Sequence, residues 1–235
     1  IGGDFGFSGA LAGRFLEYDR WEGPVARYGI DIFMTTTALA ERRRPCQAFL
    51  GAKLHDPKDP GADLQPMMIE VVSTLFELME RYESAWGDVS GSQAVPLFGF
   101  SHAVGLDPVP VKVERLAMIF RQATEDLASL WGSFLSEQSI ASLREGAATQ
   151  PDVTLPDDVW VRILFEAAAG WRRGSLPAET LITSLVPLYL GKVASFVAET
   201  RDGSDDEAEA RLESLASVFE REKHAFRDLW RAGAR

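Results

Sequence analysis

The spacing of apolar residues divides the chain into a mixed first part and a helical second part. Apolar residues recur at the three- and four-residue spacing of an amphipathic helix from about residue 64 to 86. A shorter helix is predicted over residues 10 to 18, with Ser8 as its N-cap. Another ends in the basic run 42 to 44. The mostly apolar run 47 to 54 predicts a short buried strand instead.

After residue 112 the pattern is that of helices. The predicted helices cover residues 113 to 135, 137 to 146, 157 to 171, 177 to 200 and 205 to 230. Pro156 and Pro177 mark two helix starts, and Gly170 or Gly174 marks a stop. Residues 87 to 111 are dense in glycine, proline and serine, and we place a domain boundary there.

These elements predict an α/β piece over residues 1 to 100, followed by an all-α helical domain over residues 101 to 235. Helix predominates overall. The strands predicted near Gly3, Gln47 and Leu97 are too few for an independent sheet. We expect them to pair with strands from a missing N-terminal part, from another chain, or not at all.

Composition indicates a globular, soluble protein and argues against nucleic acid as its partner. The 46% of apolar residues is ample for a core. The 35 acidic against 24 basic residues give a net charge of −11, which argues against nucleic-acid binding. The most apolar stretch, residues 181 to 197, contains Pro187 and Lys192, so no membrane span is predicted. The first residues lack the features of a signal peptide, and we expect a cytoplasmic protein.

One cysteine and one histidine lie next to the predicted strand over residues 47 to 54. Cys46 has no partner for an intrachain disulfide, which fits a reducing compartment, and we expect it in the core. His55 follows the predicted strand, at the edge where an α/β sheet presents ligands. Imidazole suits transition metals such as Mn²⁺, although spacing alone favours a structural role for His55 over a metal role. His102 and His224 are interpreted as structural.

Three sequence blocks resemble the second half of the catalytic domain of retaining GT-A glycosyltransferases. They are GGDFG at residues 2 to 6, YGIDI at residues 28 to 32 and QAFLGAKLHDP at residues 47 to 57. The group that they resemble includes mannosylglycerate synthase, glucosylglycerate synthase and glucosyl-3-phosphoglycerate synthase. The segment SLVPLYLGKVASFVAET, residues 184 to 200, is similar to bacterial proteins of this kind. The order and spacing of the blocks carry the resemblance.

The resemblance implies transfer of a hexose from a nucleotide-diphosphate sugar to a small hydroxy acid such as glycerate or 3-phosphoglycerate. It also implies a divalent metal, Mg²⁺ or Mn²⁺, which neutralises charge on the leaving diphosphate. His55 matches the metal-binding histidine. Asp31 matches an acidic residue near the donor sugar and is expected to act as an anion. The residues implied to bind substrates are Gly3, Asp4, Tyr28, Lys53 and Met67, of which Met67 fits a core position equally well.

The sequence also departs from the family pattern. It has no DxD motif at a suitable place and lacks the early β-α-β units that hold the nucleoside. We therefore interpret the chain as the C-terminal part of a longer enzyme, inactive alone and either homo-oligomeric or paired with the missing N-terminal half. The alternative is a helical interaction or oligomerisation module without catalytic activity. Its support is a set of aromatic residues expected on exposed helix faces, Trp131, Trp160, Trp171 and Trp230.

Overall fold

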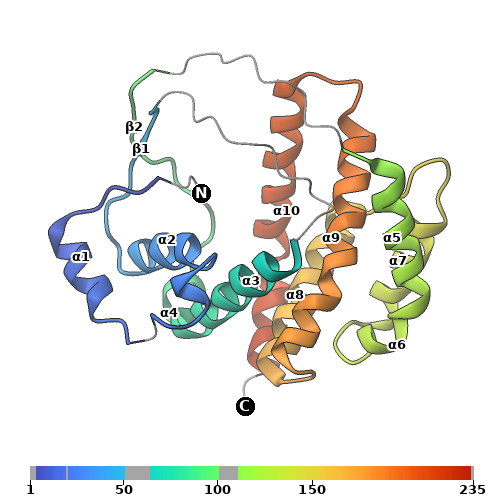
Figure 1. Ribbon diagram of the computed structural model, residues 1–235, viewed down its shortest axis with the longest axis horizontal. Helices are drawn as coiled ribbons and strands as arrows, with labels where there is room; N and C mark the ends of the chain where they lie inside the picture. Colours follow the sequence, from blue (N-terminus) through green and yellow to red (C-terminus); the bar gives the residue numbers. More distant parts are fainter. Residues whose placement is uncertain (1–3, 20, 51–63, 101–110, 234–235) are drawn as a thin grey trace. The chain divides into compact units, whose positions relative to one another are not determined.

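The computed structural model describes residues 4–19, 21–50, 64–100 and 111–233, which form two compact units (Figure 1). The first unit contains the described residues up to 100, except 64 and 65. The second contains those two residues and 111–233. The described chain is predominantly helical, which confirms that part of the predicted fold class. Gly3, Lys53, His55 and His102 lie outside the described residues.

The first unit is built around a small aromatic core. Its elements are α1 (Gly9–Leu16), the 3-10 helix η1 (Pro24–Ala26), α2 (Ile30–Ala40), β1 (Gln47–Ala48), most of α3 (Leu64–Arg81), α4 (Glu83–Trp86) and β2 (Leu97–Phe98). Ser8 caps α1 as predicted, because its hydroxyl accepts a hydrogen bond from Leu11 N. Phe33 of α2 lies at the centre of the core. Its ring centroid is 4.5 Å from that of Tyr18 and 5.5 Å from that of Trp21.

The two strands pair in parallel, with Gln47 opposite Leu97 and Ala48 opposite Phe98. The chain between them runs through α3 and α4, so the connection is a β-α-β crossover. All four strand residues are exposed. The prediction of a buried strand is therefore wrong for residues 47–50, and the rest of the predicted strand lies outside the described residues. Cys46 is also exposed, which corrects its expected core position.

The second unit is a bundle of helices. These are α5 (Val113–Asp126), α6 (Ala128–Trp131), α7 (Glu137–Ala148), α8 (Asp157–Arg173), α9 (Ala178–Thr200) and α10 (Asp205–Ala232). Helix α5 packs along α9, and α8 packs along α10 (Figure 1). Gly191 of α9 lies close against α5, because an added Cβ would be 2.5 Å from the ring of Phe120. A side chain at position 191 would therefore separate the two helices.

The tryptophans of this unit belong to its core and do not form an exposed surface. Trp131 and Trp230 are fully buried, Trp160 is 7% exposed and Trp171 is half-buried. The indole N–H of Trp131 donates to the carbonyl of Ser184 at 3.1 Å, which ties α6 to α9. The expectation of exposed aromatic faces is therefore wrong, and so is the support that it gave to an oligomerisation module.

Among the described helices, α9 alone is long and apolar enough to cross a membrane by length and composition. In the most apolar 18-residue stretch of α9, 56% is buried inside the protein. Its Lys192 is also buried there and donates to the carbonyl of Leu155 at 2.9 Å. These are the properties of a core helix, so the structure gives no clear membrane span.

Candidate functional site

The YGID block is held against α3 by one carboxylate. Glu70 of α3 accepts a hydrogen bond from Tyr28 N at 3.1 Å through its Oε2. The other oxygen of the same carboxylate pairs with the guanidinium of Arg27. Because Glu70 contacts two successive residues, it fixes the backbone that leads into α2.

Gly29 of this block lies close against α3. A Cβ at this position would lie 2.2 Å from Thr74 Oγ1, 2.8 Å from Pro24 O and 3.1 Å from Glu70 O. Real Cβ atoms do not approach other atoms at the two shorter distances. Glycine is thus required here by the space available, and its φ of −74° is an ordinary one.

Asp31 occupies the first turn of α2, where the helix dipole favours a carboxylate. Its side chain is half-buried. Within the described part of the chain it has no hydrogen-bond or ion-pair partner, in contrast to Glu70, which holds the same block. Helix-dipole stabilisation accounts for an acidic residue here, and none of the described residues uses the bonding capacity of its carboxylate.

The other described candidates lie in the same unit. Tyr28 is 50% exposed, and Met67 is half-buried in the first turn of α3, one turn before Glu70. Asp4 is exposed and precedes α1. Tyr28 and Asp31 therefore lie within one turn of each other at the start of α2, and Glu70 of α3 contacts this turn. The structure does not test the roles predicted for Gly3, Lys53 and His55.

The described side chains do not by themselves assemble the metal centre that the resemblance implies. Across residues 4–19, 21–50, 64–100 and 111–233, no three His, Cys, Asp or Glu side chains are grouped to hold a metal ion. The predicted ligand His55 is outside these ranges.

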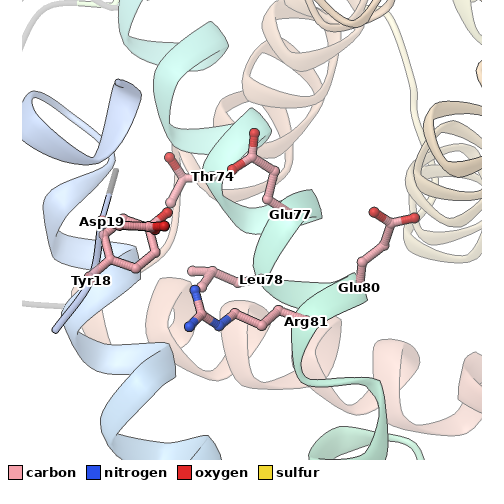
Figure 2. A pocket seen from close by; sticks show the side chains of 7 residues that line it. All are labelled: Tyr18, Asp19, Thr74, Glu77, Leu78, Glu80 and Arg81. Carbon is pink, nitrogen blue, oxygen red and sulfur yellow. The ribbon is translucent and has the colours of Figure 1, made fainter. Parts of the chain in front are cut away.

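A shallow cleft of about 400 Å³ lies beside the aromatic core and was not predicted from the sequence (Figure 2). Arg81 of α3 extends towards Tyr18, and its guanidinium carbon is 5.3 Å from the centre of that ring. The cleft is lined by Tyr18, Asp19, Thr74, Glu77, Leu78, Glu80 and Arg81. The sequence signal for it is the three- and four-residue spacing of Thr74, Glu77 and Arg81, which also fits an ordinary solvated helix face.

Comparison with protein families, with curated proteins and with solved structures finds no match to this chain.

Proposed function

We propose that the chain is the C-terminal part of a retaining, metal-dependent hexosyltransferase of the GT-A type. The donor is a nucleotide-diphosphate sugar, and the acceptor is a small hydroxy acid such as glycerate or 3-phosphoglycerate. The basis is the resemblance of the GGDFG, YGIDI and QAFLGAKLHDP blocks, together with the way the described residues hold the second of them.

The observation that carries the proposal is the rigid presentation of Asp31. Gly29 and Glu70 fix the turn that precedes it, and the carboxylate of Asp31 has no partner among the described residues. A structural carboxylate usually takes part in a hydrogen bond or an ion pair, as that of Glu70 does. A fixed carboxylate with free bonding capacity is what positioning of a sugar hydroxyl, or stabilisation of positive charge at an anomeric carbon, requires.

A second observation supports the GT-A part of the proposal. Strands β1 and β2 are parallel and joined through helices, which is the repeating unit of α/β domains. Parallel sheets are normally covered on both faces and contain more than two strands, whereas both strands here are exposed. We infer that the pair belongs to a larger parallel sheet completed by other strands.

The residues divide into roles around the acceptor and donor. Asp31 orients the donor hexose through its carboxylate, and the exposed ring of Tyr28 lies one turn away on the same segment. The resemblance assigns Gly3 and Asp4 to acceptor binding, and Lys53 and Met67 to substrate binding. His55 would hold the divalent metal, which would neutralise the charge of the leaving diphosphate. The acceptor hydroxyl oxygen forms a bond to the anomeric carbon with retained configuration as the bond to the diphosphate oxygen breaks, and the hydroxyl proton leaves with the nucleoside diphosphate.

The test is hexose transfer by the full-length protein, followed by release of the nucleotide diphosphate. Asp31→Asn removes the negative charge at nearly constant volume and should lower kcat/KM by at least about a hundredfold. His55→Ala should lower transfer and raise the concentration of Mn²⁺ or Mg²⁺ that transfer requires. The matched control is Glu22→Gln, an exposed carboxylate of the same unit outside the YGID block, which should leave transfer unchanged. Full activity in Asp31→Asn would refute the assignment of that residue.

A binding module without catalytic activity is the second candidate, and one observation favours it. Large exposed apolar residues concentrate in the first unit, where they include the strand-pair residues Phe49, Leu97, Phe98 and the following Phe100. Clustered apolar exposure is typical of protein-interaction surfaces. A dimer in solution together with no nucleotide-sugar binding by the full-length protein would support this candidate over the transferase.

A further inference from the structure

The last helix, α10, is docked to the bundle by two different kinds of contact along its length. Its buried residues Val218, Phe226 and Trp230 all lie in the second half. There the ring of Phe226 stacks on Phe165 of α8 with 4.3 Å between centroids. The guanidinium carbon of Arg172 lies 4.4 Å from the centre of the Trp230 ring. The second half is therefore held by buried aromatic surface.

The first half of α10, residues 205–217, lacks such an anchor. The residues on its inward stripe are Ala208, Arg211 and Leu215, and all three are only half-buried. Within the described chain, Arg211 is the one side chain of this half that has a hydrogen bond or ion pair to another helix. The inward stripe thus changes from aromatic to ionic near the middle of the helix.

Arg211 inserts into a connected ionic network. It donates to Asp157 Oδ2 at 2.5 Å and to Glu199 Oε2 at 2.8 Å. Asp157 also accepts from the buried Lys192 at 2.6 Å, and Glu199 accepts from Ser195 Oγ at 2.9 Å. One guanidinium therefore links α10 to the first residue of α8 and to the last turn of α9.

A serine side chain bonds to the helix backbone where the two halves meet. Ser217 Oγ donates to Glu213 O at 3.1 Å, the pattern by which a serine competes for a helical carbonyl and favours bending. The first half is also strongly acidic, with Asp205, Asp206, Glu207, Glu209 and Glu213. Without Arg211, the carboxylates of Asp157 and Glu199 would lose this guanidinium, and the first half of α10 would lose its ionic contact with α8 and α9.

We propose that α10 is a two-part helix whose first half, residues 205–217, is a releasable strap held by Arg211, while the second half stays docked through its aromatic residues. Release occurs by bending near Ser217 when the ionic network is screened or broken. It exposes the side chain of Asp157, which is 12% exposed in the docked state, to solvent. The strap lies within the helical unit and does not depend on the sugar transfer proposed above.

Hydrogen exchange along α10 tests the strap, because a free helix of about 13 residues is marginal in water and exchanges quickly. Amides of residues 208–217 should exchange about tenfold faster in Arg211→Gln than in the wild type, and those of residues 219–231 should not change. Arg211→Lys, which keeps the charge but loses the forked geometry, should lie between the two. In the wild type, raising NaCl from about 0.1 to 1 M shortens the Debye length from about 10 to 3 Å and should give the same pattern.

The matched control is Arg221→Gln in the second half of the same helix. The ion pair of Arg221 is with the neighbouring Glu222, so its loss should leave residues 208–217 unchanged. Equal exchange in Arg211→Gln and Arg221→Gln would overturn the proposal. Faster exchange over the whole of α10 in Arg211→Gln would also overturn it, since the helix would then dock as one piece. Circular dichroism of each variant should match that of the wild type, which checks that the variant is folded.

Discussion

Replacing Gly29 by alanine tests the contact that fixes the YGID block. The added methyl would lie 2.2 Å from Thr74 Oγ1 and 2.8 Å from the backbone oxygen of Pro24. Both atoms must move, and the Pro24 oxygen belongs to the backbone of η1, where movement disturbs the turn into α2. Overpacking of this kind destabilises by about 1–3 kcal/mol, and two simultaneous clashes put the expected loss at about 2–3 kcal/mol.

A double-mutant cycle separates the two clashes. Thr74→Ala removes the nearer atom, but it also removes the 2.7 Å hydrogen bond from Thr74 Oγ1 to Glu70 O, and it should cost about 1 kcal/mol alone. In the double variant the methyl group added at position 29 occupies part of the vacated space, so the combined loss should be smaller than the sum of the two single losses by about 1 kcal/mol. The clash with Pro24 O remains and prevents full rescue.

The assay is urea unfolding of the first unit, read by hydrogen exchange of the α2 amides so that the two units are distinguished. Gly13→Ala in α1 is the control, because an added Cβ there meets nothing within 4 Å. Alanine should stabilise that helix by about 0.5–1 kcal/mol. A Gly29→Ala variant as stable as the wild type would refute the tight approach of the YGID block to α3, and with it the rigid presentation of Asp31.

Three further changes have defined outcomes. Thr37→Val should raise the free energy of unfolding by about 1 kcal/mol, because Thr37 is 3% exposed and its hydroxyl has no partner among the described residues. A lower free energy of unfolding in urea would contradict this and show that the hydroxyl is hydrogen-bonded. Arg42→Gly should raise the free energy of unfolding, measured in the same way, by about 0.5–1 kcal/mol, because Arg42 has a left-handed φ of 55° at the end of α2. A lower free energy of unfolding would mean that the contacts of the Arg42 side chain stabilise the protein by more than the backbone strain costs. Burial raises the pKa of Asp157, but hydrogen bonds from Arg211 and Lys192 outweigh it and hold that pKa below its ordinary value. Asp157→Asn should therefore lower the free energy of unfolding by about 2 kcal/mol at pH 7. The difference from the wild type should shrink as the pH falls from about 4, the pKa of an unfolded Asp, through the lower folded-state pKa; a difference that does not shrink over this range would contradict this.

Local signals in the sequence predicted the helices well. The Ser204 to Glu207 pair forms a capping box at the expected start of α10. Gly174 ends α8 with a left-handed φ of 66°. Gly170, the other candidate stop, lies inside α8, where an added Cβ would be 2.5 Å from Phe134. Only the packing of α8 distinguishes the two glycines, and packing is not visible in a local pattern.

Tertiary contacts explain the predictions that failed. The single helix expected over residues 113 to 135 ends at Asp126, and Leu127 separates it from the short α6 that carries the buried Trp131. The buried partner of Trp131 is Ser184, 53 residues away, so its burial was not predictable from its own helix. The run 47 to 54 is apolar as a buried parallel strand would be, yet its described part is exposed. An apolar run is typical of a strand that is buried on both faces. Burial itself also requires neighbouring elements to cover the strand, and these cannot be predicted from the run.

The candidate site was predictable only in part. Asp31 and Tyr28 were identified by the resemblance of the YGIDI block, and the structure adds Glu70 and Thr74 as the residues that hold this block. Glu70 lies 42 positions from Tyr28 along the chain, so a local pattern gave no sign of its role. The cleft beside Tyr18 arises in the same way, from segments that meet only in the folded unit.

The most direct measurement of the central claim is acceptor-dependent release of nucleotide diphosphate by the full-length protein. The donors are UDP- and GDP-linked glucose and mannose, and the acceptors are glycerate and 3-phosphoglycerate, with Mn²⁺ or Mg²⁺ present. The proposal predicts release with at least one pair, a product whose anomeric configuration is that of the donor, and near-complete loss in Asp31→Asn but not in Glu22→Gln. Absence of release with every pair, or full release by Asp31→Asn, would contradict it.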